Sequence, residues 1–329
     1  MLRRTFNALL LGGAAAMPAA AFSPEVKPPV KVGVQLSGTA QWEMQVILDR
    51  GLDVEHGFTL ELLDVADKQA GHVALMAGAA DVILSDFVWV AALRAAGEAM
   101  TCVPHSLAVG GLVVPQDSPI ASVADLPGKT IGIAGGPVDK SWIVLQAYFA
   151  QQTGGVLADQ IEANFGAPPL INELLTEGSI DAALNFWHFN ARAKAAGNIE
   201  LISVHDMLTG LGVTTLPPML AWVFREDLAA EKPEALRGFF DASFAAKRLM
   251  AHSDTLWDTL REKMNAVDDD ALFTTLRDDY RRGIIAGFDD ATIAAAAQTF
   301  ALMAQYGGPD LVGDATEMDP GTFWSGYRT

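Results

Sequence analysis

The sequence contains a single cysteine, Cys102, among its 329 residues, so the chain cannot form an internal disulfide. A protein without disulfides depends on its hydrophobic core for stability. Hydrophobic residues make up 50% of the chain, and its length suffices for two ordinary lobes with such cores.

Positive charge is also scarce, because 22 Lys and Arg residues stand against 40 Asp and Glu residues. The formal net charge of −18 gives a surface that repels nucleic acid and anionic lipid. We therefore expect neither nucleic acid nor anionic lipid as a partner. The net charge does not identify a ligand, since a cleft can carry a local field unlike the average.

The motifs of common enzymes are missing. The six histidines show no spacing with cysteines or carboxylates that is typical of a metal site. The chain contains no G-x-S-x-G phrase, and Cys102 has no neighbouring motif that would activate its thiol. The glycine loop AGGPVDKSW (Ala134–Trp142) lacks the Gly-Lys-Ser/Thr ending of a phosphate-binding P-loop. These absences disfavour an enzyme, and we expect no cofactor.

The first residues have the pattern of a secretory signal peptide. Arg3 and Arg4 precede the apolar stretch Ala8–Met17, and small residues crowd Pro18–Phe22. The apolar stretch is shorter than the ~20 residues that a transmembrane helix needs. We expect residues 1–21 to be removed and the mature protein to be periplasmic. Arg3–Phe6 also resembles a twin-arginine signal, so the general and the twin-arginine export routes both stay open.

Two phrases that lie 100 residues apart are nearly the same. ALMAGAADVILSD (Ala74–Asp86) and LLTEGSIDAALNF (Leu174–Phe186) share leucine, glycine and aspartate at matching positions. A chance echo is the alternative, because glycine after a helix and aspartate in a turn are ordinary local chemistry. Trp42 and Trp142 repeat the same spacing, which favours an internal duplication.

The order of predicted elements is also the same in both halves. The pattern of apolar residues predicts strands at 30–36, 58–65 and 81–86, then at 129–136, 161–166 and 181–187, and helices at 43–52, 69–77, 142–154 and 170–178. Strands that alternate with helices form a parallel sheet with right-handed crossovers. The sequence therefore predicts an α/β fold with two parallel-sheet lobes.

Two segments have the character of crossings between these lobes, Ser106–Pro119 and Thr214–Asp227. From Lys232 onward the chain is mostly helical, and its apolar stripes are expected to pack on the first lobe. We therefore assign residues 30–112 and 220–329 to lobe 1, and residues 113–219 to lobe 2.

A family resemblance rests on two phrases. ILDRGLDVEHGFTLELLDV…GHVALMAGAADVILSD (Ile47–Asp86) resembles the signature of substrate-binding proteins of ABC importers, in the group for nitrate, taurine, alkanesulfonates and thiamine precursors. SPIASVADLPGKTIGIAGG (Ser118–Gly136) is similar to that group's entry into its second lobe, and the whole resemblance covers Lys31–Asp227. It implies a monomeric type II periplasmic binding protein that closes on a small solute and delivers it to an ABC permease with its ATPase.

Two alternatives share the implied fold. One is an extracytoplasmic solute sensor with the same cleft. The other is an enzyme of the thiamine-pyrimidine-synthase type, although the cysteine-rich stretch of those enzymes is missing here.

In open α/β sheets, ligands lie beyond the carboxyl ends of the strands, so four loops become candidates for the solute site. In lobe 1, the candidate side chains are Ser37, Thr39, Gln41, Trp42, Ser85 and Asp86. In lobe 2, the candidates are Gly136, Asp139, Lys140, Ser141, Asn185, Trp187 and His188.

Each loop also has a purely structural interpretation. Ser37, Thr39 and Asp86 are typical helix caps. The loop around Gly136 can offer free N–H groups and a helix dipole to an anion, while Lys140 can simply face solvent. A histidine such as His188 is more often satisfied by the protein than by a ligand.

The chemistry of the solute stays open between three classes. Trp42 and Trp187 favour a flat or apolar part, and we predict that Trp187→Ala weakens binding without unfolding the protein. Asp86 with Asp139 would suit a cation, whereas the resemblance implies anions such as sulfonates. The expected solute is a sulfonate, an amine, a pyrimidine or a similar small molecule.

Overall fold

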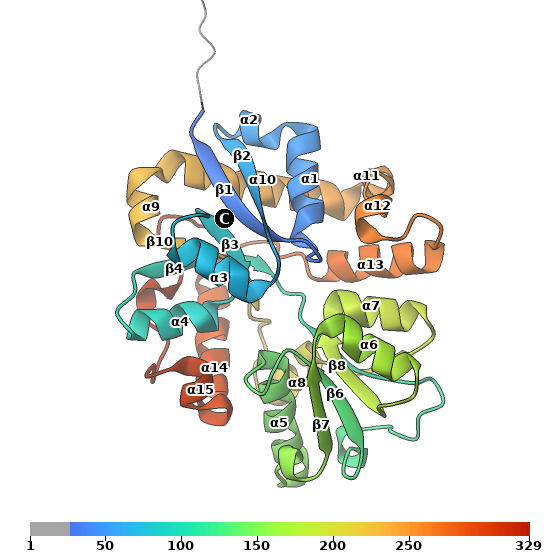
Figure 1. The fold of residues 1–329 in the computed structure, drawn as a ribbon. Coiled ribbons are helices and arrows are strands. Elements are labelled where there is room, and N and C mark those ends of the chain that lie inside the picture. The colour runs from blue at the N-terminus through green and yellow to red at the C-terminus, as the bar shows by residue number, and fades with distance from the viewer. Residues whose placement is uncertain (1–26) are drawn as a thin grey trace, which may run out of the picture.

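The computed structural model describes residues 27–329, so the signal peptide expected at residues 1–21 lies outside the described residues. The chain forms two five-stranded sheets, each with its own helices (Figure 1). The first sheet contains β1 (Pro29–Gln35), β2 (Thr59–Val65), β3 (Val82–Ser85), β4 (Met100–Ser106) and β10 (Leu220–Arg225). The second contains β5 (Gly110–Val114), β6 (Thr130–Ala134), β7 (Glu162–Gly166), β8 (Ala182–Phe186) and β9 (Ile199–Ser203).

The two sheets have the same topology. Their strand orders are β2-β1-β3-β10-β4 and β7-β6-β8-β5-β9. In each sheet, one strand is antiparallel to both of its neighbours, β10 in the first and β5 in the second. The sheets are thus mixed rather than wholly parallel, because β5 and β10 enter them directly from the crossings. The two-lobed α/β fold itself is confirmed.

Helices surround both sheets. Those of the first half are α1 (Ala40–Arg50), α2 (Leu52–Glu55), α3 (Lys68–Met76) and α4 (Phe87–Ala95), and those of the second are α5 (Lys140–Thr153), α6 (Pro168–Thr176), α7 (Trp187–Ala195) and α8 (Val204–Gly210). The C-terminal part contains α9 (Glu226–Glu231), α10 (Pro233–His252), α11 (Asp254–Asp258), α12 (Arg261–Met264), α13 (Asp270–Arg282), α14 (Asp290–Gly307) and α15 (Pro309–Val312). Within residues 27–329, no helix is both long enough and apolar enough to cross a membrane.

The sequence repeat corresponds to the same pair of hydrogen bonds in each lobe. The Asp81 carboxylate accepts the Lys31 N–H (2.9 Å), and the Asp81 N–H donates to the Lys31 carbonyl (2.8 Å). Asp181 forms the same two bonds with Thr130, both at 2.8 Å. In both lobes the repeated aspartate therefore joins the start of the third strand to the start of the first.

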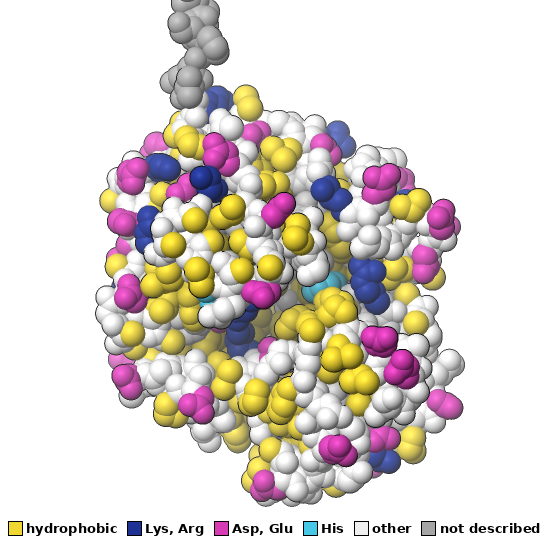
Figure 2. Space-filling view, viewed as in Figure 1, with side chains coloured by type: hydrophobic (Ala, Val, Ile, Leu, Met, Phe, Trp, Pro, Cys, Tyr) yellow, Lys and Arg dark blue, Asp and Glu magenta, His cyan; other side chains and the backbone are white. Residues whose placement is uncertain are grey.

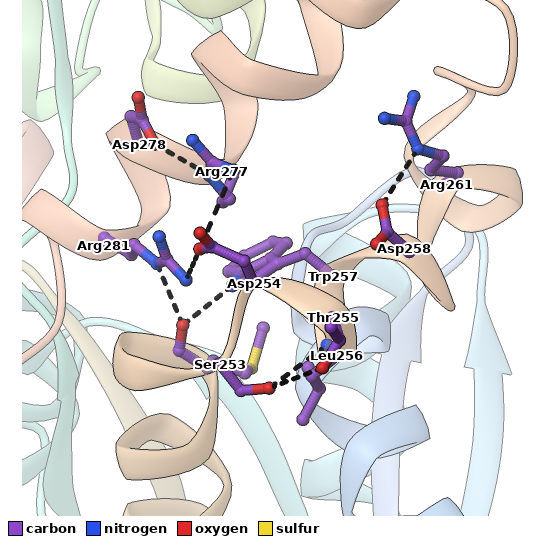
Figure 3. Close-up of polar contacts among 11 residues, drawn as sticks. Ser253, Asp254, Thr255, Leu256, Trp257, Asp258, Arg261, Arg277, Asp278 and Arg281 are labelled. Carbon is purple, nitrogen blue, oxygen red and sulfur yellow. Dashed lines mark hydrogen bonds and ion pairs between the residues drawn. The ribbon is translucent and has the colours of Figure 1, made fainter.

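The C-terminal helices contact both lobes. Helix α10 packs against α1, α2 and β1 of the first lobe, as the sequence predicted for this segment. Helix α13, however, packs against α7, and α14 packs against α5, so both also contact the second lobe (Figure 1). Asp254 of α11 holds α13 through Arg281 (2.7 Å) and Arg277 (3.8 Å), as Figure 3 shows. Periodicity predicted these helices but could not indicate which lobe each one touches.

Residues 107–109 form the first crossing, and Gly110 begins the strand that follows it. The φ angle of Gly110 is 127°, and a Cβ there would lie 2.1 Å from the Asn185 carbonyl oxygen. Only glycine fits this close approach between β5 and the end of β8.

We therefore expect Gly110→Ala to lower the free energy of unfolding by about 3 kcal/mol, because strained backbone and a backbone clash combine. Gly97→Ala is the matched control, since Gly97 also has a positive φ of 90° but has no atom near its missing Cβ. We expect the control to cost only about 1 kcal/mol. Urea denaturation measures both, and equal losses would contradict the prediction.

Candidate functional site

The loops that follow β1, β3, β6 and β8 meet between the two lobes. Trp42, at the start of α1, contacts Trp187, at the start of α7, with ring centroids 6.0 Å apart. Lys140, at the start of α5, places its Nζ 2.8 Å from an Asp86 oxygen at the start of α4. Figure 2 shows a hollow between the lobes in which basic and histidine side chains are visible. The carboxyl ends of both sheets therefore face one shared region.

Asp86 is the centre of a charged cluster in this region. It is 2% exposed, and its Oδ2 contacts Lys140 Nζ (2.8 Å) and Lys68 Nζ (3.0 Å). Its Oδ1 accepts the Trp89 N–H (2.9 Å) and caps α4. Burial alone would raise the pKa of Asp86, but the charges of Lys140 and Lys68 hold it well below its usual range. Asp86 is thus both a helix cap and an ionised partner that joins the lobes.

The two lysines differ in their surroundings. The Lys68 side chain is half-exposed; its partial burial and the nearby Lys140 charge lower its pKa, although Asp86 opposes this effect. The pKa of Lys140 is raised, because the charges of Asp86 and Asp139 outweigh its burial. Burial in turn raises the pKa of Asp139. Two cations and two carboxylates thus lie together in the region between the lobes.

The helix N-termini that face this region fall into two groups. Asp67, Asp86 and Asp139 cap α3, α4 and α5 with their side chains, whereas α1, α6 and α7 begin without a side-chain cap. Asp139 accepts the Ser141 N–H (2.9 Å). One of the backbone N–H groups that were expected to bind an anion near Gly136 is therefore already hydrogen-bonded. Gly136 itself borders open space. At the N-termini of α1 and α7, by contrast, no side chain neutralises the positive end of the helix dipole.

Four aromatic rings form a cluster beside the charged residues. Tyr280 of α13 lies 6.0 Å from both Trp42 and Trp187 and 5.2 Å from Trp257 of α11. Trp187 is 8% exposed, and the Trp42 Nε1–H donates to the Lys263 carbonyl (3.2 Å). Trp42 and Trp187 were predicted to contact the solute, and in this conformation their rings are packed against each other and against Tyr280.

The other two candidates from the β8 loop have different environments. The Asn185 amide donates to Asn172 Oδ1 and to the Pro168 carbonyl, both at 2.9 Å, and accepts the Phe186 N–H. Through these hydrogen bonds, Asn185 connects β8 to α6. The Nδ1 atom of His188 is buried and has no partner among residues 27–329, and burial lowers the pKa of His188 to about 3. His188 is therefore neutral at pH 7.

The polar candidates after β1 lie at the edge of the region. Ser37 is exposed, and Thr39 precedes α1 without forming a side-chain cap. Gln41 donates to the Gln35 carbonyl (2.7 Å) and so closes its own loop. From this loop, Trp42 contacts the second lobe through the ring of Trp187.

Ser85 contacts His72, which together with the nearby Lys68 was not among the residues predicted from the sequence. Its Oγ lies 2.9 Å from His72 Nε2, and the His72 ring stacks on Trp89 at 3.6 Å. Burial and the nearby Lys68 charge lower the pKa of His72 to about 4. Lys68 and His72 follow β2, so the rule that located the other loops would have found them. Tyr280 and Trp257 gave no such signal, because they come from helices distant in sequence.

The single cysteine of the chain is not accessible to a substrate in this conformation. Cys102 is fully buried, and burial raises the pKa of its thiol. Across residues 27–329, no three His, Cys, Asp or Glu side chains are grouped so that they could hold a metal ion.

The model of the family described as NMT1/THI5 like matches residues 48–254. The chain belongs to the NMT1/THI5-like family. A comparison with curated protein sequences found no significant match for this NMT1/THI5-like chain.

Solved structures share the fold at low sequence identity. The periplasmic aliphatic sulphonate-binding protein SsuA from Escherichia coli is 16% identical, with a TM-score of 0.68 over 88% of this chain and 97% of its own. The alkanesulfonate-binding protein SsuA from Xanthomonas axonopodis pv. citri, bound to MOPS, is 16% identical, with a TM-score of 0.66 over 87% and 97%. The desulfurization enzyme DSZB is 15% identical, with a TM-score of 0.55 over 88% and 94%. These likenesses establish the type II periplasmic binding fold of this family member.

Proposed function

We propose that this NMT1/THI5-like protein is the periplasmic solute-binding component of an ABC-type importer. It captures a small organic solute between its lobes as a monomer and delivers it to a permease and its ATPase. The observation that carries the proposal is the meeting of four strand-end loops from two lobes around charged and aromatic side chains. Similarity to the SsuA proteins supports the solute-binding role.

The two lobes are proposed to close about residues 107–109 and 214–219. One body then contains residues 30–106 and 220–329, and the other contains residues 110–213, because the strand that begins at Gly110 belongs to the second sheet. A solute that contacts both lobes favours the closed state, because it binds that state more tightly than the open one. The rings of Trp42, Trp187 and Tyr280 suit a flat or apolar part of the solute. The uncapped starts of α1 and α7 suit its polar group.

The SsuA proteins bind sulfonates, so sulfonates are the first class to test here, followed by pyrimidines, amines and small carboxylates. In a thermal-shift screen of the mature protein, we expect one class to raise the melting temperature. A solute at a hundredfold excess over its Kd adds about 2.7 kcal/mol to the free energy of unfolding. Mass spectrometry of molecules that copurify provides an independent readout. No shift with any class, together with no copurified molecule, would contradict the proposal.

An enzyme on the same fold is the second candidate, because DSZB shares the architecture. We propose no catalytic role, since Cys102 is buried. A sensor would share the cleft. Genes for a permease and an ATPase beside this gene would distinguish import from sensing.

A further inference from the structure

A buried carboxylate lies directly behind the aromatic cluster. Glu43 follows Trp42 on α1 and is completely inaccessible to solvent. Four side chains surround its two oxygens: His105 Nε2 at 2.9 Å, Lys247 Nζ at 2.8 Å, Tyr280 OH at 3.2 Å and Ser243 Oγ. These residues come from β4, α10 and α13, so Glu43 joins three elements to α1.

Glu43 is charged in the folded protein. Burial alone would raise its pKa, but the charge of Lys247 and the hydrogen bond with His105 lower it to about 2. Burial also lowers the pKa of His105. Burial lowers the pKa of Lys247, which is itself only 2% exposed. A buried carboxylate and a buried ammonium group therefore compensate one another, and removal of either leaves an uncompensated buried charge.

One hydrogen bond connects this charge to the cluster between the lobes. Tyr280 donates its hydroxyl to Glu43, while its ring contacts Trp42, Trp187 and Trp257. Contacts between rings fix the orientation of an aromatic side chain only weakly, because an aromatic pair contributes about 0.5–1.5 kcal/mol beyond its buried area. The bond to Glu43 fixes its hydroxyl end, and the ring orientation follows.

The same network adjoins the first crossing. His105 lies one residue before the end of β4, and the next two residues contact the end of α13. Ser106 Oγ donates to the Gly283 carbonyl (3.0 Å), and the Leu107 N–H donates to the same oxygen (2.9 Å). The crossing, α13 and the buried carboxylate are thus held together.

We propose that Glu43 is a positioning residue for the solute site, which acts by holding the Tyr280 hydroxyl so that the rings of Tyr280, Trp42 and Trp187 keep one arrangement between the lobes. This inference rests on the proposed solute-binding function. Glu43 touches no solute itself and acts through Tyr280.

Tyr280→Phe tests the link, because it removes the hydroxyl and keeps the ring. The chain offers a matched control in Tyr327→Phe, since the Tyr327 hydroxyl donates to Asp241 (2.9 Å) and Tyr327 is as buried as Tyr280, at 7% exposure for both. Tyr327 packs against Phe240 and Phe244 rather than against the cluster.

The measurement is fluorine NMR of the full mature protein labelled with 5-fluorotryptophan, with the Trp42 and Trp187 signals assigned from single Phe variants. In Tyr280→Phe, we expect both signals to broaden about twofold or more, because the rings exchange between arrangements. In Tyr327→Phe both signals should stay unchanged, and the fall in melting temperature should be smaller, because Asp241 is exposed whereas Glu43 is buried.

A purely stabilising role for the Glu43 network would lower the melting temperature in Tyr280→Phe and leave the two signals unchanged, which would overturn the proposal. Equal broadening in both variants would also overturn it. The measurement needs no solute, so its result is independent of whether the thermal-shift screen finds one.

Discussion

Asp86→Asn is expected to lower the free energy of unfolding by about 3 kcal/mol, because it leaves the ammonium groups of Lys68 and Lys140 without their shared partner. Asparagine caps helices as well as aspartate does, so the bond to the Trp89 N–H can persist and the loss reports the charge. Urea denaturation at pH 7 measures the difference from the wild type.

Asp67→Asn is the matched control. Asp67 also caps a helix, through the Ala70 N–H (2.8 Å), but it is exposed and forms no ion pair among the described residues. We expect its loss to stay within about 0.5 kcal/mol. If both variants lost the same amount, the ion pairs of Asp86 would contribute nothing beyond the cap.

The effect of Asp86→Asn should also depend on pH. The folded-state pKa of Asp86 lies below its usual value, so its charge stabilises the fold above about pH 4. This contribution is lost as the pH falls through that folded-state value. The difference between wild type and variant should therefore be constant from pH 5 to about pH 7 and should shrink in more acidic solution. A constant difference down to pH 2 would show that the carboxylate charge is not its cause.

Trp187→Ala is expected to have two effects, an opening of the lobes and a loss of about 3 kcal/mol in the free energy of unfolding. The sequence predicted weaker binding alone, but Trp187 is 8% exposed and packs against Trp42 and Tyr280. Its removal leaves a cavity where the two lobes touch. Small-angle X-ray scattering should show a larger radius of gyration, and urea denaturation should show the lower stability.

Trp142→Ala separates these two effects. Trp142 is the counterpart of Trp42 in the second lobe and is 3% exposed, but it packs against Phe165 of the same lobe. Its removal should reduce stability by a similar amount and leave the radius of gyration unchanged. An equal expansion of both variants would mean that partial unfolding, and not the contact between lobes, explains the larger size.

Local patterns in the sequence located β1, β2, β3, β6, β7 and β8 together with α1, α3, α5 and α6. They did not predict β4, β9, α4, α7 or α8, and β5 and β10 lie in segments that were interpreted as crossings. The predicted strand 58–65 is β2 (Thr59–Val65), and the predicted helix 142–154 lies within one to two residues of α5 (Lys140–Thr153). The repeated phrases correctly marked equivalent positions, because Asp81 and Asp181 form the same hydrogen bonds. These features depend on neighbours close in sequence or on direct repetition.

The sequence could not indicate which side chains from distant segments contact one another. Asp86 was predicted either to cap a helix or to meet a ligand; in the structure its oxygens cap α4 and also bind two lysines. Asn185 follows a strand at the position expected for a ligand contact, yet its side-chain N–H groups donate hydrogen bonds to α6. Glu43 and Lys247 lie 204 residues apart, and no periodicity relates them.

The order of the strands along the chain sets the order in which the two sheets can be completed. The sheet of the second lobe draws all its strands from residues 110–203, so it can be complete before residues 220–225 join the fold. The sheet of the first lobe must wait for β10, which inserts between β3 and β4 only after residue 225 has emerged. The lobe that begins first along the chain is thus the last to close its sheet, and until then β3 and β4 lack the strand that joins them.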